Sequence, residues 1–317
     1  MGSVGAAGDG ERHDRWSEIK RHLHDWWQGY LPEDAPFAPP PTLDLATPAR
    51  PQPDPAPHPD WSKDRLALVQ LLWGEGFSSP GEAEHVLTLI KPLGLNPKMS
   101  VVDLNPGLGG TTRVIAKETG AWITAFEVDP DLAAAGQALS VKAGMAKKAE
   151  IRSFTPPRTE LRPGSMDAVF AKESLNQIED RKTLFRELYT VLKPQGQVLF
   201  TDYVLSKDGE SSAKLGEWLA RERPTPTLWT ADKTAKTLRE AGYDVRVNED
   251  ISAKLRQLVV AGWARYIGTL KPGAVDPAFG EAVIHEIELW SRRLSLIDSG
   301  EIACHRFHAF KIESQVR

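Results

Sequence analysis

Short apolar runs alternate with amphipathic stretches over most of the chain beyond residue 60. The apolar runs are rich in β-branched and aromatic residues, which is typical of buried strands. They predict strands over residues 101–104, 122–126, 149–154, 165–171, 197–203, 243–248 and 301–312. The stretches between most of these runs have the three- and four-residue apolar spacing of helices. Strand and helix in alternation predict an α/β fold with a doubly wound, seven-stranded sheet.

Local signals add detail to this prediction. Residues 62–72 predict a helix, and residues 79–82 have the S-x-x-E form of a capping box, with Pro80 at the first helical position. The capping box predicts a second helix that ends near Gly94. Two further helical stretches, rich in aromatic residues, lie within residues 250–299. We expect them to form a helical insertion before the last strand and to cover the site as a lid.

The N-terminal part of the chain has a different pattern. Residues 14–31 place an aromatic and aliphatic stripe, including Trp26 and Trp27, on one face of a helix. Residues 32–59 contain eleven prolines, which exclude regular helix or sheet. We therefore expect an amphipathic arm (1–31), a Pro-rich linker (32–60) and a main domain (61–317). The arm is expected to pack on the main domain or on a second subunit, with another partner or a membrane surface as alternatives.

A Gly-rich loop follows the first predicted strand. Residues 100–112 read S-V-V-D-L-N-P-G-L-G-G-T-T, a buried strand that ends beside Asp103 and leads into the start of a helix. In an open α/β sheet this arrangement builds a nucleotide site at the carboxyl end of the strand. Glu127 ends the next predicted strand, where a carboxylate accepts hydrogen bonds from ribose hydroxyls. The pattern therefore predicts a ligand that contains ribose. The loop lacks G-x-G-x-x-G, which disfavours a nicotinamide dehydrogenase.

Composition excludes several classes of protein. A chain of 317 residues with 41% hydrophobic and 26% charged residues is typical of a globular protein. The net charge of −4 provides no basic surface for nucleic acid. The single cysteine, Cys304, excludes an internal disulfide and a cysteine-cluster metal site. No apolar run is long enough for a membrane span and no secretory signal is visible, so we expect a cytoplasmic protein without a metal.

Three motifs in order resemble the class I S-adenosylmethionine-dependent methyltransferases. These are the Gly-rich loop, residues 165–178 (S-M-D-A-V-F-A-K-E-S-L-N-Q-I) and residues 191–203 (V-L-K-P-Q-G-Q-V-L-F-T-D-Y). Residues 73–81, W-G-E-G-F-S-S-P-G, resemble a more specific block of the small-molecule N-methyltransferases that act on phosphoethanolamine, sarcosine or dimethylglycine. The resemblance implies a Rossmann-like fold with an antiparallel last strand, S-adenosylmethionine as cofactor and methylation of a small metabolite at nitrogen, oxygen or carbon.

The resemblance also implies cofactor contacts from the Gly-rich loop, from the ends of the second, third and fourth strands, and from the 73–81 block. The expected contacts are Asp103, Asn105, Gly107, Gly109, Glu127, Val128, Phe154, Thr155, Lys172, Trp73 and Ser79. Asn105 stands where the family has the first glycine of the loop. The acid that receives the adenine amino group in the family is replaced by Phe154 and Thr155.

Polar residues at the ends of the fourth and fifth strands are the candidates for substrate contacts. Glu173, Asp202 and Tyr203 are the expected catalytic residues, and their carboxylates and phenol suit a cationic or amine-bearing substrate. The catalytic Tyr and His of the phosphoethanolamine branch align with Val69 and Gln177 here. These departures favour an alternative hypothesis, a non-catalytic protein that keeps the fold and binds a partner or ligand.

Overall fold

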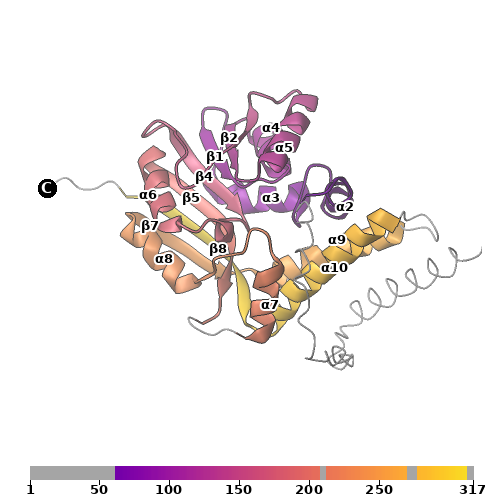
Figure 1. Cartoon of the computed structure of the whole chain (residues 1–317). Helices are drawn as coiled ribbons and strands as arrows, with labels where there is room; N and C mark the ends of the chain where they lie inside the picture. The colour runs from indigo at the N-terminus through magenta and orange to yellow at the C-terminus, as the bar shows by residue number, and fades with distance from the viewer. Residues whose placement is uncertain (1–60, 208–211, 270–276, 313–317) are drawn as a thin grey trace, which may run out of the picture.

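The computed structural model describes residues 61–207, 212–269 and 277–312. The predicted arm and Pro-rich linker lie outside the described residues, so both stay predictions. The described residues form one sheet with helices packed against it (Figure 1). Its strands are β1 Ser100–Leu104, β2 Trp122–Glu127, β3 Ala149–Ser153, β4 Met166–Lys172, β5 Leu192–Leu205, β6 Trp229–Thr230, β7 Tyr243–Asp250 and β8 Ile302–Lys311.

The strand order is β3-β2-β1-β4-β5-β8-β7, and the two-residue strand β6 pairs with β5 off this path. Strands β1 to β5 are parallel, whereas β8 is antiparallel to both β5 and β7. The predicted doubly wound sheet with an antiparallel last strand is therefore confirmed, and β6 is an addition. Strand β1 lies inside the sheet, and the chain turns to opposite sides after β1 and β4. That is the switch point at which α/β sheets bind ligands.

Helices follow most strands and begin where their sequences provide caps. Ser62, Asp129, Asp180, Ser212 and Thr230 each accept a hydrogen bond from a backbone N–H in the first turn of the helix that follows. The helices are α2 Lys63–Trp73, α3 Glu82–Ile90, α4 Gly110–Thr119, α5 Pro130–Lys142, α6 Arg181–Val191, α7 Ala213–Arg221, α8 Ala231–Glu240, α9 Ser252–Thr269 and α10 Pro277–Asp298. Three-residue 3₁₀ helices lie at Lys91–Leu93 and Leu175–Gln177.

Apolar residues alternate between two hydrophobic clusters on the sheet faces. Val101 and Phe170 belong to one cluster with residues of α2, α3, α4, α9 and α10. Their chain neighbours Val102 and Val169 belong to the other cluster, with residues of α6 and α8. This two-residue period explains why the strands read as continuous apolar runs, since both faces of the sheet are covered.

Two details of the sequence prediction are wrong. Helix α3 begins at Glu82 with Gly81 as its N-cap, at φ 114°, and not at a capping box on Ser79. The Ser79 hydroxyl accepts a hydrogen bond from Lys172 instead, so it is not free to cap a helix. Helix α7 was not predicted at all. Its sequence AKLGEWLAR is short but clearly amphipathic, and it buries Leu215 and Trp218 on one face.

Helices α9 and α10 occupy the chain between β7 and β8, where a helical insertion was expected. They pack on α2, and α10 also packs on α7 (Figure 1). No helix in the described residues is long and apolar enough to cross a membrane. Gly262 permits the close contact between α9 and α2, because a Cβ at this position would lie 2.3 Å from a ring carbon of Trp73 and 2.9 Å from the Leu72 carbonyl oxygen.

Replacing Gly262 with Ala is expected to destabilise the fold by about 1–3 kcal/mol, since the added methyl group overpacks this contact. The matched control is Gly216→Ala in α7, where a Cβ meets nothing within 4 Å. The control should be neutral or stabilising by up to about 1 kcal/mol, because Ala favours a helix over Gly. Urea unfolding of both variants measures the difference. Equal stability of the two variants would contradict close packing of α9 on α2.

Candidate active site

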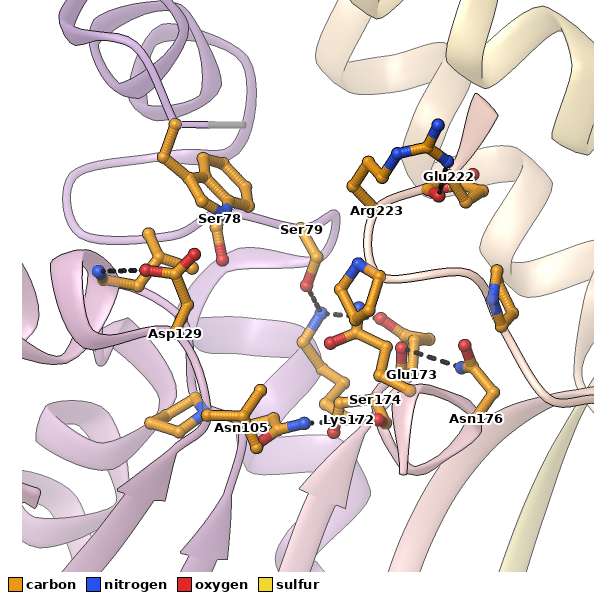
Figure 2. A pocket seen from close by; sticks show the side chains of 18 of the residues that line it. Ser78, Ser79, Asn105, Asp129, Lys172, Glu173, Ser174, Asn176, Glu222 and Arg223 are labelled. Atoms are coloured by element: carbon orange, nitrogen blue, oxygen red, sulfur yellow. Dashed lines mark hydrogen bonds and ion pairs between the residues drawn. The ribbon is translucent and has the colours of Figure 1, made fainter. Parts of the chain in front are cut away.

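A cavity lies at the carboxyl ends of β1, β2, β4 and β5, beneath the loop of residues 74–81 and beside α7 and α10. One part of it, the loop half, is lined by residues that follow β1 and β2. These are Asp103, Asn105, Pro106, Gly107, Thr111, Glu127, Val128, Asp129 and Leu132. The other part, the distal half, is lined by residues of β5, α2, α7 and α10 and the loop after α7. Its main side chains are Trp61, Arg65, Tyr203, Trp218, Glu222, Arg223, Glu286, Leu289, Trp290 and Arg293. Lys172 and Glu173 lie between the two halves (Figure 2).

The backbone turns sharply where β1 meets the Gly-rich loop. Asn105 has φ 51° and Gly107 has φ 59°, and both conformations are left-handed. Asn tolerates this region better than most residues, so the turn survives the replacement of the family glycine. The Asn105 side chain donates from Nδ2 to the Ser174 carbonyl oxygen at 3.4 Å. Its Oδ1 is buried and has no hydrogen-bond partner in the described part of the chain, which leaves one acceptor unused beside the cavity.

Glu127 is held by backbone groups at the end of β2. Its Oε2 accepts a hydrogen bond from the Gly107 N–H at 2.8 Å, and its Oε1 accepts one from the Asp129 N–H at 3.0 Å. A carboxylate has about four acceptor positions, so two remain. The side chain is 3% exposed, and burial raises its pKa to about 7. Burial likewise raises the pKa of Asp103 to about 7, although the Thr112 hydroxyl donates to this carboxylate at 2.7 Å.

The loop of residues 74–81 lies directly on the Gly-rich loop. The Gly110 N–H donates to the Gly76 carbonyl oxygen at 2.7 Å. A Cβ on Gly107 would lie 2.0 Å from the Ser78 hydroxyl oxygen, so only glycine allows this approach. The Lys172 ammonium group fixes the same loop to β4, because it donates to the Ser79 hydroxyl at 2.5 Å and to the Pro80 carbonyl oxygen at 2.7 Å (Figure 2). The covering loop is therefore attached to both neighbouring strands.

Glu173 follows β4 with a left-handed backbone, at φ 49°. Its Oε2 accepts from the Lys172 ammonium at 3.0 Å, and its Oε1 accepts from the Thr201 hydroxyl at 2.9 Å. The side chain is buried and lines the cavity between its two halves (Figure 2). A strained residue of this kind often marks a functional site.

Aromatic rings and ion pairs line the distal half. Arg293 donates from Nε and Nη2 to the two oxygens of Glu222, at 2.7 Å each, and the Trp218 indole donates to the same carboxylate. Glu286 accepts from Arg65 at 2.6 Å and from the Trp290 indole at 3.1 Å. Both carboxylates therefore have a cation and an indole as partners.

Comparison with known proteins agrees with this geometry. Residues 102–200, which run from β1 into β5, match the family model described as a methyltransferase domain. Residues 102–200 thus belong to a methyltransferase domain. Phosphoethanolamine N-methyltransferase 1 of Zea mays is 24% identical over 186 residues, which are 58% of this chain and 36% of that protein. The chain thus matches about a third of that relative's length.

Two solved structures share the fold of this methyltransferase domain. Phosphoethanolamine N-methyltransferase 2 of Haemonchus contortus, in complex with S-adenosyl-L-methionine, superposes with a TM-score of 0.68 at 21% identity, over 78% of this chain and 57% of that chain. A [4+2]-cyclase superposes with a TM-score of 0.62 at 17% identity, over 79% and 94% of the two chains. At these identities the likeness shows the fold alone.

The structure brings most of the predicted site residues of the methyltransferase domain to one cavity. Those that line it are Asp103, Asn105, Gly107, Glu127, Val128, Lys172, Ser79, Glu173 and Tyr203. Gly109, Phe154, Thr155 and Trp73 do not. Gly109 faces Ile151, Phe154 packs on Phe126 at 5.3 Å between ring centroids, and Thr155 is exposed elsewhere. Trp73 is 1% exposed and packs edge-on against Trp290.

Asp202 is also absent from the cavity lining, which corrects the prediction that it contacts a substrate. Its carboxylate accepts from Arg181 at 3.3 Å and from the Asn176 amide at 2.5 Å, and all three side chains are buried. Arg181 also donates a hydrogen bond to the Thr227 carbonyl oxygen. Asp202 thus positions Asn176 and the loop of residues 223–229, and burial raises its pKa to about 6.

Sequence reasoning missed the helical residues of the distal half. Trp218 and Glu222 of the α7 end, and Glu286 and Trp290 of α10, belong to no motif. A signal does exist, because each Trp lies four residues from the Glu to which its indole donates. That spacing places both side chains on one helix face. In the described residues no group of His, Cys, Asp or Glu has the arrangement of a metal site.

The raised pKa of Glu127 predicts a pH-dependent stability. Its pKa rises from the ordinary 4.5 to about 7, so between these values the folded state binds more protons than the unfolded state. The stabilisation that comes from the raised pKa of Glu127 is full below about pH 4.5 and is lost as the pH rises through 7. Between pH 5 and 8 the free energy of unfolding should fall by about 2 kcal/mol more in the wild type than in Glu127→Gln. Denaturation at each pH measures this slope. The exposed Glu179→Gln should keep the wild-type slope, and a wild-type slope in Glu127→Gln would contradict burial of a charged Glu127.

Proposed function

We propose that the chain is an S-adenosylmethionine-dependent methyltransferase that acts on a small molecule. The observation that carries this proposal is the cavity itself. It joins an acidic half beneath the Gly-rich loop to an aromatic half, and Glu173 lies at the junction. The methyltransferase domain and the relatives' names support the same reaction class. A cytoplasmic enzyme, and an arm that contacts a second subunit, remain expectations from the sequence.

The loop half fits this cofactor in charge and in hydrogen bonding. Asp103, Glu127 and Asp129 line it, and the neighbouring Lys172 ammonium is already engaged by Ser79, Pro80 and Glu173. The half therefore favours a cationic ligand, and S-adenosylmethionine carries a sulfonium and an ammonium group. The two remaining acceptor positions of Glu127 suit ribose hydroxyls.

The unused Oδ1 of Asn105 is an acceptor for the ammonium group at the methionine end. The replacement of the family glycine therefore adds a ligand contact here and does not block the loop. Asn105 follows β1 and Glu173 follows the adjacent strand β4, and both residues line the cavity.

When bound, the cofactor supplies a methyl group that its positive sulfonium already activates. The remaining tasks of the protein are to align the nucleophile, to exclude water and to accept a proton where the nucleophile carries one. Glu173 is the carboxylate placed for the proton, at the junction of the two halves. The 74–81 loop and helices α7 and α10 are placed to exclude water.

A second candidate function is a reaction or binding role without methyl transfer. The structural likeness to a [4+2]-cyclase favours this candidate, because that protein shares the fold and is named for a cyclisation and not for methyl transfer. The replaced residues at Val69 and Gln177 point the same way. The two candidates differ in one measurable outcome, the transfer of a labelled methyl group from S-adenosylmethionine.

Glu127→Gln should weaken the binding of S-adenosylhomocysteine by about 1–3 kcal/mol, because the ribose hydroxyls lose a charged acceptor. Wild-type affinity should increase as the pH rises through 7, since the carboxylate accepts only after it releases its proton. Isothermal titration calorimetry at pH 6 and pH 8 tests both statements. The exposed Glu179→Gln serves as the control. Unchanged affinity in Glu127→Gln would exclude the ribose contact, and failure of the wild type to bind would exclude the proposed function.

Glu173→Gln should lower kcat by about a hundredfold or more, if the carboxylate accepts the proton of the nucleophile. It should also lower stability, because the buried Lys172 loses its ion pair, so kcat is measured where the variant is folded and still binds the cofactor. A screen of amines, hydroxylated aromatics and quinols for labelled methyl uptake identifies the substrate for this measurement. Asp202→Asn is the contrasting variant. It should destabilise the fold by about 3 kcal/mol, because the buried Arg181 loses its ion pair. Cofactor binding without turnover on any compound would favour the second candidate function.

A further inference from the structure

The Tyr203 hydroxyl has no hydrogen-bond partner in the part of the chain that the structure describes. The side chain is 4% exposed and lines the distal half of the cavity. No backbone or side-chain group of the described residues lies within hydrogen-bond geometry of this hydroxyl. Burial raises the pKa of Tyr203 well above its ordinary value, so the hydroxyl keeps its proton at neutral pH. It is thus a donor at the wall of the cavity that is available to a ligand.

Arg293 provides a second donor to the same wall. Its Nε and Nη2 atoms are used by Glu222, while Nη1 has no acceptor in the described part of the chain. The guanidinium carbon lies 4.7 Å from the Trp290 ring centroid and 5.8 Å from the Tyr203 ring centroid. The ion pair and the ring contact hold the guanidinium in one orientation beside Tyr203.

Three ion pairs account for the carboxylates of the distal half and of the junction. Glu222 is paired with Arg293, Glu286 with Arg65, and Glu173 with Lys172. These three carboxylates therefore have little charge left to attract a cationic substrate, the class expected from the sequence. Arg65, Arg293 and Lys172 are neutralised in the same pairs, whereas Arg223 donates only to the backbone carbonyl oxygens of Ala220 and Glu222 among the described residues. Trp218, Trp290 and Leu289 provide apolar walls.

We propose that the distal half binds an acceptor substrate that is a phenolic ring, with its oxygen accepting hydrogen bonds from the Tyr203 hydroxyl and Arg293 Nη1. This inference rests on the proposed function. The aromatic walls contact the faces and edges of the ring, since Tyr203 and Trp218 already meet edge to face at 71°. Arg293 Nη1 can only donate, and the Tyr203 hydroxyl can donate as well, so a ligand atom that contacts both must be an acceptor. An oxygen with lone pairs meets that requirement, and a quaternary ammonium does not.

The test uses the full chain saturated with S-adenosylhomocysteine and three probes, 2-naphthol, phosphoethanolamine and choline, in equilibrium dialysis. We expect 2-naphthol to bind and to lose about five- to tenfold in affinity in Tyr203→Phe and in Arg293→Lys, the effect of one lost hydrogen bond. Tyr189→Phe and Arg292→Lys are matched controls that lie outside the cavity lining, and both should bind 2-naphthol as the wild type does. Tyr203→Phe keeps the ring and its packing, so it remains informative if Arg293→Lys proves unstable.

The outcomes separate the two proposals. Calorimetry with S-adenosylhomocysteine alone comes first, and if the wild type does not bind it, the proposed function fails. Dialysis of 2-naphthol against the ligand-free chain then still tests the distal half. The subsite is overturned if 2-naphthol does not bind, or if it binds equally to the wild type and Tyr203→Phe. It is also overturned if phosphoethanolamine or choline binds in a way that depends on Tyr203 while 2-naphthol does not.

Discussion

The arrangement of the whole site depends on one buried ammonium group. Lys172 has three N–H donors, and the structure uses them on Ser79, Pro80 and Glu173. A buried ammonium group without partners would cost several kcal/mol, so these contacts must form together or not at all. They join the covering loop, the end of β4 and the candidate proton acceptor in one unit. The same cation cancels the charge of Glu173, which makes the junction of the cavity nearly neutral.

The two halves of the cavity differ in how their charges are compensated, and this difference separates their tasks. In the loop half, Glu127 is held by backbone N–H groups and has no cation as partner among the described residues, so its carboxylate is left for a ligand. In the distal half, Arg293 and Glu222 compensate each other. In the proposed function, the loop half therefore binds the cofactor by charge, and the distal half selects the substrate by shape and by a small number of oriented donors. Binding by charge suits a cofactor that many enzymes share, and selection by shape suits a specific substrate.

The sheet could be predicted from the sequence because each buried strand carries its own apolar signal. The Gly-rich loop and Glu127 could be predicted for the same reason, since they follow those strands directly. Ser79 was misread because the capping-box pattern is local, while its hydroxyl is used by Lys172, a residue of β4 distant in sequence. Asp202 was misread in a similar way, because strand-end position does not show that Arg181 would reach its carboxylate.

The distal half was beyond prediction for a more general reason. Its walls come from α2, β5, α7 and α10, and only the packing of these elements decides that they meet.

Two non-glycine residues with left-handed backbones, Asn105 and Glu173, follow the adjacent parallel strands β1 and β4. Each such conformation costs about 1–2 kcal/mol for a residue with a Cβ. Glycine at either position would remove the strain, yet it would also remove the only side chain there that faces the cavity. The fold holds both residues in place through the pairing of β1 with β4 and through Ser174, whose carbonyl oxygen accepts from Asn105. The strain is therefore located at the ends of two adjacent strands, from the loop half (Asn105) to the junction of the two halves (Glu173). In the proposed function, this is the position at which a methyl donor and its acceptor are brought together.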